Sequence, residues 1–226
     1  MGCILKGGGG LYSRLMVGAV LLAAGAGSRI GRRPKSLLEL GGVPLIRRQL
    51  IALSGAGVDE VVVVLGHHAE LIEPLVQSFP VTLVRNPRPD DGQISSLRCG
   101  LAGLSGKLDA VLVALADQPL INAQDITSLI GAWKKRAEGR ELLLPEIAGE
   151  PGNPVMFSAE VREQILAGNA NIGCRQWRAA HPEAVAIFRT DNRRFKVDVD
   201  TEEDIARFER DTGHALRWPA ALVLPT

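Results

Sequence analysis

Small residues interleaved with basic ones follow an apolar stretch near the start of this 226-residue sequence, and this combination could hold phosphate. The segment reads AAGAGSRIGRRPK from Ala23 to Lys35. Small residues allow backbone N–H groups to close around phosphate oxygens. Arg29 could bind a phosphate through two parallel hydrogen bonds, whereas Lys35 would act as a compact positive charge. We therefore predict a phosphate-binding loop; the alternative is a glycine-rich turn with solvated basic side chains.

The spacing of the glycines excludes two common nucleotide-binding motifs. A P-loop requires Gly-x-x-x-x-Gly-Lys-[Ser/Thr], and Lys35 follows Gly31 at the wrong distance. The dinucleotide fingerprint requires Gly-x-Gly-x-x-Gly, and Gly31 comes one residue too late after Gly25 and Gly27. The segment must therefore be another kind of phosphate loop.

Two acidic segments could hold a metal ion opposite such a loop. Asp117 follows the apolar run 110–115, and the carboxyl end of a parallel strand faces a ligand crevice. Asp198 and Asp200 alternate within VDVD, which predicts that both point to one face of a short strand. Asp117 and Asp200 also have a structural alternative, because each could cap the helix that follows it. Together with a triphosphate, the three carboxylates would suit Mg²⁺.

The elements that must position these residues alternate along the chain. Continuous apolar runs predict strands buried on both faces, and apolar residues at helical spacing predict amphipathic helices. The expected strands cover 17–23, 61–65, 81–84, 110–115, 155–157, 184–188 and 196–199. The expected helices cover 44–53, 69–76, 95–104, 122–136, 160–166, 174–180 and 201–211, with Ser95, Asn122 and Thr201 as N-caps and 145–154 as a loop. This repetition predicts a single-domain, Rossmann-like α/β fold, a three-layer sandwich with a mostly parallel mixed sheet.

Neither end of the sequence joins this regular pattern. Residues 1–15 are expected to be a leader that could lack fixed structure, with Met16 as an alternative first residue. The folded domain is expected over 16–212, followed by a C-terminal tail over 213–226. The apolar stretch 17–26 imitates a signal peptide, but we interpret it as the first core strand, because about ten residues cannot span a bilayer.

Composition argues against several function classes. The net charge is +1, from 26 basic and 25 acidic residues, which argues against a general grip on nucleic acid or an anionic membrane. The three cysteines are far apart and form no Cys-x-x-Cys pair, so neither a zinc site nor a disulfide scaffold is expected. Reduced thiols predict a cytoplasmic protein. The four histidines receive no functional role.

The glycine loop and the acidic segments together resemble a known enzyme family. The pattern L-A-A-G-x-G-x-R-x-G-x-x-x-K, from Leu22 to Lys35, is similar to the signature loop of nucleotidyltransferases with a GT-A-like fold. LADQPL around Asp117 and DVDTEEDI from Asp198 resemble the metal-binding and closing motifs of the molybdenum cofactor cytidylyltransferase family. Guanylyl relatives tend to read L-A-G-G in the first loop, so Ala24 favours a cytidylyl enzyme.

Three further segments resemble motifs of the same branch. They are 86–97, similar to a base-binding segment, 152–157, similar to a substrate strand, and 168–175, similar to a G-D-x-G-A-R stretch. Asn153 stands where this branch more often has His, so the acceptor motif departs from the family pattern. The resemblance runs from about 17 to 207, which is nearly the whole expected domain.

The resemblance implies roles for the matching positions. Arg29, Lys35 and Asp117 would be catalytic, while Asp117, Asp200 and Asp198 would hold Mg²⁺, with Mn²⁺ able to replace it. The positions implied to bind nucleotide are Leu22, Ala23, Ala24, Gly25, Gly27, Arg29, Lys35, Asn86, Gly92, Ser95 and Ser96. The positions implied to bind the acceptor are Gln118, Gly152, Asn153, Pro154 and Arg175.

The reaction implied by the resemblance is transfer of CMP from CTP to the phosphate of molybdopterin, with release of pyrophosphate. A transient contact with a molybdoenzyme or its maturation factor is expected, and neither nucleic acid nor a membrane is an expected partner. One alternative is a nucleotidyltransferase that uses GTP or another phosphorylated acceptor, such as a sugar, polyol or phospholactate. Another is a non-catalytic nucleotide- or cofactor-binding chaperone for molybdoenzyme maturation, against which Lys35, Asp117 and Asp200 argue.

Overall fold

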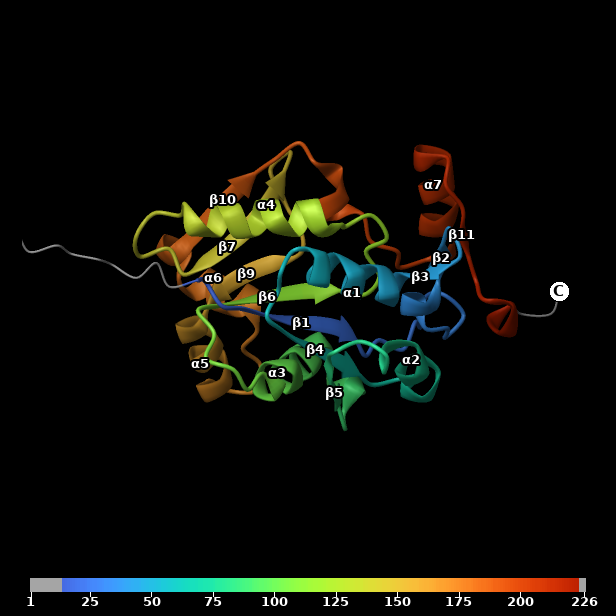
Figure 1. The fold of residues 1–226 in the computed structure, drawn as a ribbon, viewed down its shortest axis with the longest axis horizontal. Coiled ribbons are helices and arrows are strands. Elements are labelled where there is room, and N and C mark those ends of the chain that lie inside the picture. The colour runs from blue at the N-terminus through green and yellow to red at the C-terminus, as the bar shows by residue number, and fades with distance from the viewer. Residues whose placement is uncertain (1–13, 224–226) are drawn as a thin grey trace, which may run out of the picture.

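An eight-stranded mixed sheet forms the centre of the computed structural model, which describes residues 14–223 (Figure 1). Its strands run in the order β10-β7-β9-β6-β1-β4-β5, and β8 pairs with β7 off this path. Neighbouring strands are parallel, except that β9 is antiparallel to β6 and β7, and β8 to β7. The strands are β1 (Val17–Ala23), β4 (Glu60–Leu65), β5 (Thr82–Arg85), β6 (Ala110–Leu115), β7 (Leu142–Ile147), β8 (Glu150–Pro151), β9 (Val155–Ser158) and β10 (Val185–Arg189).

The central strand β1 sets the position of the ligand crevice. All of its residues are buried apart from the half-buried Leu22, as a parallel strand covered on both faces requires. Leu22 pairs with Val64 of β4 on one side and with Leu115 of β6 on the other. The carboxyl ends of these three strands therefore meet at one edge of the sheet, and the loops that leave them lie together.

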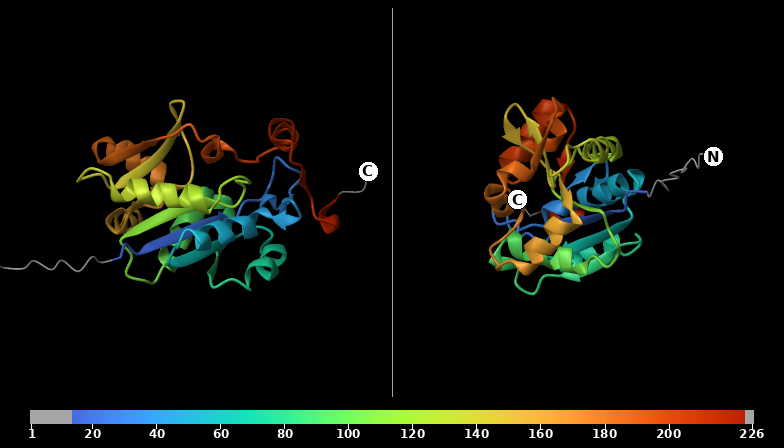
Figure 2. Two further views of the ribbon diagram at one scale, coloured as in Figure 1. Left: turned by 45° about the horizontal axis from the view of Figure 1, so that its top comes forward. Right: turned by 90° about the vertical axis from the view of Figure 1, so that its left-hand side faces the viewer.

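Helices cover both faces of the sheet, which makes three layers (Figure 2). On one face, α1, α2 and α4 share a hydrophobic cluster with Ala19 and Leu21 of β1. On the other, α3, α5 and α6 share a cluster with Val20, because successive strand residues point to opposite faces. The helices are α1 (Leu45–Gly55), α2 (Ala69–Val76), α3 (Gln93–Gly103), α4 (Ala123–Lys134), α5 (Ala159–Ala167) and α6 (Cys174–Ala180). The expected Rossmann-like α/β fold with a mostly parallel sheet is confirmed.

A second, three-stranded sheet lies beyond the carboxyl end of β1, at the right of Figure 1. Its order is β11-β2-β3, and α7 lies against β11. These elements are β2 (Glu39–Leu40), β3 (Val43–Pro44), β11 (Leu216–Arg217) and α7 (Glu202–Thr212). They enclose a small hydrophobic cluster made by Ile30, Leu38, Leu40, Leu45, Val199, Phe208 and Leu216. The sequence did not indicate this sheet, because two-residue strands are too short to carry a pattern.

Two of the three predicted N-caps are present. Asn122 caps α4 and Thr201 caps α7, each by accepting a backbone N–H bond within a capping box. Ser95 is not a cap, because α3 begins two residues earlier, at Gln93. The Ser95 hydroxyl instead accepts a hydrogen bond from Asn86 Nδ2 at 3.0 Å. A tertiary contact therefore took the place of the expected local one.

Two segments differ from the expected secondary structure. Residues 196–199 form no strand, because a 3-10 turn covers Arg193–Lys196 and the following residues are irregular. Residues 145–154 are not a plain loop, because β7 continues to Ile147 and turns through Ala148 and Gly149 into β8. In both cases the secondary structure depends on whether another strand is available for pairing. The residue types of the segment alone do not determine this.

The two ends of the chain are described only in part. Residues 1–13 of the expected leader and the last three residues of the tail lie outside the described residues. Arg14 is described and donates to Asp59 at 2.7 Å. Within the tail, Leu216 and Arg217 pair with β2, so this part of the tail packs on the domain.

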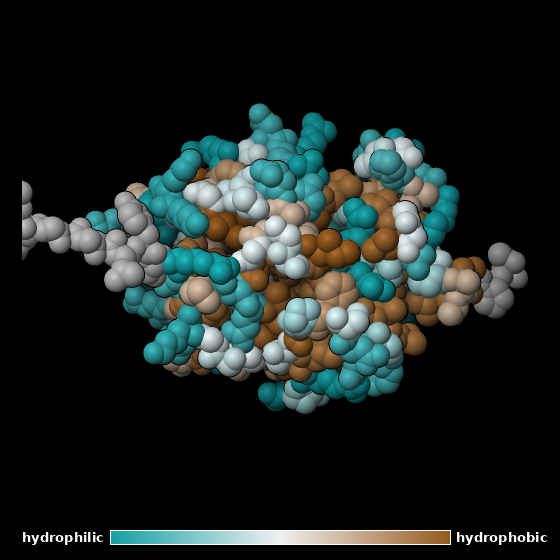
Figure 3. All heavy atoms as spheres, in the orientation of Figure 1, coloured by the Kyte–Doolittle hydropathy of each residue, from teal (hydrophilic) through white to brown (hydrophobic). Residues whose placement is uncertain are grey.

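Polar side chains cover most of the outline of the face seen in Figure 3, and hydrophobic atoms show mainly toward its middle. Ile51 of α1 is 56% exposed and Leu71 of α2 is 47% exposed, so a few apolar side chains reach solvent. Within residues 14–223, no helix combines the length and the apolar character needed to cross a membrane.

Gly100 tests how closely α3 packs on the sheet, and Gly131 of α4 serves as its control. A Cβ on Gly100 would lie 2.3 Å from Val20 Cγ1 and 2.7 Å from Val64 Cγ2, whereas one on Gly131 of α4 would meet no atom within 4 Å. We expect Gly100→Ala to lower the free energy of unfolding by about 1–3 kcal/mol, because α3 must move off the sheet. The matched control Gly131→Ala should raise it by up to about 1 kcal/mol, because alanine favours the helix. Urea unfolding followed by circular dichroism measures both, and a stabilised Gly100→Ala protein would contradict the close packing.

Candidate active site

A pocket of about 550 Å³ opens where β1 and β6 end. This position is the one at which open parallel sheets bind ligands. The pocket is lined by residues from the ends of these strands, the glycine loop, α2, the turn before α3, the first turn of α3, the segment before β9 and the segment before α7. They are Leu22, Ala23, Ala24, Gly25, Arg29, Pro34, Lys35, Ser36, Ile72, Pro89, Gly92, Gln93, Ser96, Leu115, Ala116, Asp117, Asn153, Asp198 and Asp200.

The glycine loop is compact because it hydrogen-bonds to itself. The carbonyl of Gly27 accepts from the N–H groups of Ile30 and Arg32, each at 2.9 Å. Gly27 has a φ of 62°, and a Cβ there would lie 2.0 Å from the carbonyl oxygen of Arg33. Only glycine fits this position. Gly27 was expected to bind nucleotide, but it does not line the pocket, and its observed part is to shape the loop.

The two acidic segments meet through one backbone hydrogen bond. Val199 N donates to Asp117 O at 3.2 Å, which joins the irregular segment before α7 to the end of β6. Lys35 Nζ then donates to Asp117 Oδ2 at 2.5 Å and to Asp200 Oδ1 at 2.6 Å. Arg29 pairs with Asp200 at 2.8 Å from the other side. Three segments that are distant in sequence thus form one charged group within the pocket.

The charges of this group shift one another's pKa values. Burial alone would lower the pKa of Lys35, but contact with Asp117 and Asp200 outweighs burial and raises it. Burial would raise the pKa of Asp200, but Lys35 and Arg29 outweigh it and hold that pKa below its ordinary value. The pKa of Asp198 is raised by loss of solvent and by the negative charges of Asp117 and Asp200. The lysine and Asp200 are therefore both charged near neutral pH.

The oxygen atoms of this group fit a hard divalent cation. Asp117 Oδ1 is buried and makes no hydrogen bond within the described part of the chain. Such an oxygen is costly unless a ligand satisfies it. Among residues 14–223, however, no three His, Cys, Asp or Glu side chains are gathered closely enough to hold a metal by themselves. Lys35 balances the two carboxylates in this state, so phosphate and water oxygens would have to complete a Mg²⁺ shell.

The expected base-binding residues divide into two sets. Gly92 and Ser96 line the pocket. Asn86 and Ser95 do not, because Asn86 is 5% exposed and its Nδ2 donates to the hydroxyls of Ser95 and Ser96, both at 3.0 Å. Asn86 therefore positions the start of α3 from beneath the pocket.

The expected acceptor residues are brought together only in part. Asn153 lines the pocket, whereas Gln118, Gly152, Pro154 and Arg175 do not. Gln118 is 1% exposed, and its Nε2 donates to the carbonyls of Asn153 at 3.3 Å and Phe195 at 3.2 Å, so it supports the backbone beside the pocket.

Several lining residues were not predicted. Ile72 reaches the pocket from α2, Pro89 from the turn before α3, and Gln93 from the first position of α3. Pro89 and Gln93 lie within the expected base-binding segment 86–97 but were not singled out, and no sequence signal marked Ile72. His68 had received no role, yet its Nε2 lies 3.2 Å from the carbonyl of Ala26 in the glycine loop. The His67–His68 pair belongs to no motif, so no sequence signal indicated such a contact.

The open sheet with a glycine loop at its carboxyl edge defines an α/β protein of the nucleotide-binding type. Residues 19–185 match the MobA-like NTP transferase domain family. The chain belongs to this family, whose enzyme class is nucleotidyltransferase. The resemblance drawn from the sequence motifs is thereby confirmed at the level of this family.

Individual relatives agree with this assignment of family and fold. Nicotine blue oxidoreductase of Paenarthrobacter nicotinovorans is 31% identical over 196 residues, which cover 84% of this chain and 95% of that protein. A nucleotidyl transferase from Methanothermobacter thermautotroptrophicus is 27% identical, with a TM-score of 0.71 over 87% of this chain and 97% of its own. Rv0371C of Mycobacterium tuberculosis H37Rv, solved in complex with manganese, shares the fold at 24% identity, with a TM-score of 0.67 over 87% of this chain and 100% of its own.

Proposed function

We propose that the protein transfers CMP from CTP to the phosphate of a molybdopterin-type acceptor and releases pyrophosphate. One observation carries the proposal: two cationic side chains, Arg29 and Lys35, share one pocket with a buried oxygen of Asp117 that has no partner among residues 14–223. This combination suits a triphosphate together with its counter-cation. The molybdopterin acceptor rests on the resemblance of 152–157 and 168–175 to the cytidylyltransferase motifs.

In the proposed reaction, an oxygen of the acceptor phosphate attacks the α-phosphorus of CTP. The bond from that phosphorus to the bridging oxygen breaks, and pyrophosphate leaves with the electron pair. No protein nucleophile takes part, so positioning and charge neutralisation supply the rate enhancement. Arg29 and Lys35 would neutralise the departing pyrophosphate.

Asp117 and Asp200, with Asp198 in reserve, would hold Mg²⁺, or Mn²⁺ in its place, and the bound ion would withdraw charge from the phosphates. The glycine loop would cradle the triphosphate through its backbone N–H groups. Leu22 to Gly25 would line the base and ribose, together with Gly92 and Ser96, which line the same pocket. Asn153 is the proposed contact to the acceptor.

A matrix of nucleotides against acceptors tests this function. CTP, GTP, ATP and UTP are each combined with molybdopterin, a sugar phosphate, a polyol phosphate and phospholactate, in the presence of Mg²⁺ or Mn²⁺. Pyrophosphate release is expected to be greatest with CTP and molybdopterin. Release with a different pair would replace the acceptor or nucleotide while keeping the reaction class. Nucleotide binding without release from any pair would favour a non-catalytic chaperone in molybdoenzyme maturation.

The relative named as an oxidoreductase supports a second candidate function. It matches nearly its whole length to this chain, so its similarity is not confined to one motif. To test it, NADH or NADPH is supplied as a trial electron donor together with the compound in that relative's name. Absorbance at the reduced nicotinamide band separates this candidate from transfer, because nucleotidyl transfer leaves that band unchanged.

A further inference from the structure

The glycine loop is held from outside by the last part of the chain. Figures 1 and 2 show α7 and β11 beside β2 and β3, at the end of the molecule where β1 delivers the loop. Ile30, inside the loop, is fully buried in a cluster with Phe208 of α7 and Leu216 of β11. These C-terminal residues lie beyond the matched family region 19–185.

Arg33 makes the polar part of this attachment. Its guanidinium lies over the ring of Trp218, 4.0 Å from the centroid, and forms an ion pair with Glu202 at the start of α7. Its Nε donates back to the carbonyl of Ile30 at 3.2 Å. The Arg33 side chain is only 13% exposed, so its charge interacts mainly with these protein groups and little with solvent.

The attachment lies between the two cations proposed to bind the triphosphate. Arg29 precedes Ile30, and Lys35 follows Arg33 by two residues. The carbonyl of Arg33 also packs against Gly27, at the other end of the turn. Moving Arg33 would therefore shift the backbone that carries both cations. Arg33 itself is not among the residues that line the pocket.

Trp218 contributes its ring face rather than its N–H group. Trp218 Nε1 is buried and has no hydrogen-bond partner among residues 14–223. An aromatic face above a guanidinium is attractive without any such bond. A phenylalanine at 218 should keep the ring contact, whereas a leucine should lose it.

We propose that Glu202 and Trp218 act through Arg33 as positioning residues that hold the glycine loop in its triphosphate-binding shape. We call these three residues the C-terminal clamp. This inference rests on the proposed nucleotide site, and it extends that site to the tail of the chain. The clamp residues touch no reacting atom, so their effect must appear in the order of the loop and in the affinity for phosphates.

The test compares matched variants of the full chain. Glu202→Gln removes the ion pair, and Glu203→Gln is its control, because the exposed Glu203 follows it in the same helix turn and is not paired with Arg33. Trp218→Leu removes the aromatic ring, and Trp218→Phe is its control because it keeps an aromatic ring at this position. Amide hydrogen exchange over 27–35 is measured without ligand, and inorganic triphosphate binding is measured by calorimetry.

Glu202→Gln and Trp218→Leu are expected to speed exchange in 27–35 and to weaken triphosphate binding by about fivefold each, the size of a single ion pair or cation–π contact. Glu203→Gln and Trp218→Phe should stay near wild type. In transfer assays, KM for the nucleotide should rise while KM for the acceptor and kcat stay close to wild type. A merely structural role would change both KM values together.

Unchanged exchange in 27–35 for both Glu202→Gln and Trp218→Leu would overturn the clamp. Loosening of the loop by Glu203→Gln to the same extent as by Glu202→Gln would overturn it as well. Exchange does not depend on catalysis, so it supports or overturns the clamp even if the wild-type protein transfers no nucleotide. That last result would instead contradict the proposed function.

Discussion

Asp117→Asn is expected to lower kcat by about 10²- to 10³-fold, the range typical of losing one electrostatic contact to a transition state. The substitution keeps the size of the side chain but removes the charge that faces the pocket. Its Oδ1 is a buried carboxylate oxygen that no other described group satisfies, so it is the natural place for a cation. With an amide there, a divalent cation would bind weakly and the phosphates would keep their full repulsion.

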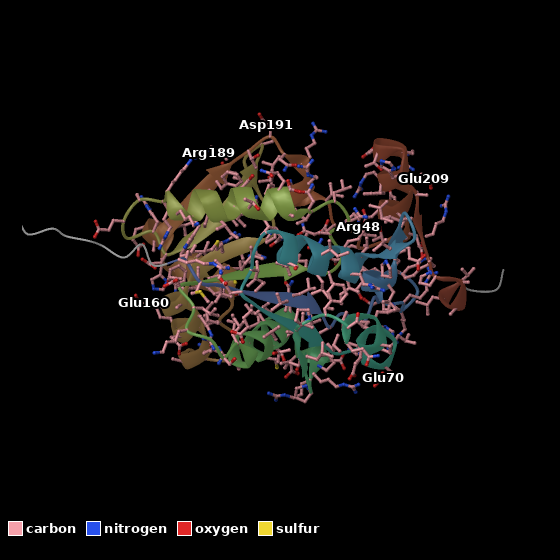
Figure 4. The ribbon with its side chains drawn as sticks, viewed as in Figure 1. Arg48, Glu70, Glu160, Arg189, Asp191 and Glu209 are labelled. Atoms are coloured by element: carbon pink, nitrogen blue, oxygen red, sulfur yellow. The ribbon has the colours of Figure 1, made fainter. Side chains whose placement is uncertain are left out.

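Pyrophosphate release at saturating CTP and acceptor measures this change. The matched control is Asp191→Asn, because Asp191 lies at the outer surface and points away from the body of the protein in Figure 4. The control should keep wild-type kcat. Lys35 retains its contact with Asp200 in the variant, so the melting temperature should change by only a few degrees for the loss of one part-exposed pair. Normal turnover by Asp117→Asn would show that the metal assignment is wrong.

Lys35→Met is expected to lower kcat/KM by about 10²- to 10³-fold, because a charge that stabilises the departing pyrophosphate is lost. Methionine keeps much of the apolar stem but cannot pair with phosphate. The structure adds a second expectation, since Lys35 donates to both Asp117 and Asp200 in the absence of a ligand. Without the ammonium, Asp117 would lose its cationic partner and Asp200 would keep only Arg29, so the two carboxylates would attract a divalent cation more strongly.

Mn²⁺ binding to the nucleotide-free protein therefore gives a readout that does not depend on turnover. Titration followed by electron paramagnetic resonance should show tighter Mn²⁺ binding to Lys35→Met than to wild type. Lys107→Met is the matched control, because Lys107 is exposed and lies outside the pocket. It should alter neither Mn²⁺ binding nor kcat/KM. Weaker Mn²⁺ binding by Lys35→Met would contradict the view that the lysine holds the place of a cation.

The strands and helices that form the sandwich could be predicted because their signals are local. β1 and β6 are continuous apolar runs, as buried parallel strands must be. The caps at Asn122 and Thr201 depend on residues within one helix turn. The glycine loop was recognisable for the same reason, since its small and basic residues are contiguous.

The errors fall where pairing or contact with another segment decides the structure. The β7–β8 hairpin exists because its two segments pair with each other across Ala148 and Gly149. Residues 196–199, which were expected to be a strand, pair with no strand and are irregular after Lys196. Ser95 lost its expected capping role to a contact with Asn86. The second sheet forms because β11, in the C-terminal tail, pairs with β2. A two-residue strand is too short to show a sequence pattern that predicts such pairing.

The sequence by itself determined the class of fold, the phosphate loop and the identity of the charged residues, because each depends on neighbours a few positions away. Only the tertiary structure decided how these charges meet. Asp117 and Asp200 come together through a backbone bond between Val199 and Asp117, and Lys35 then lies between the two carboxylates. The same is true of the C-terminal clamp on the glycine loop. Such contacts depend on the packing of whole elements, which short-range patterns of residue type do not specify.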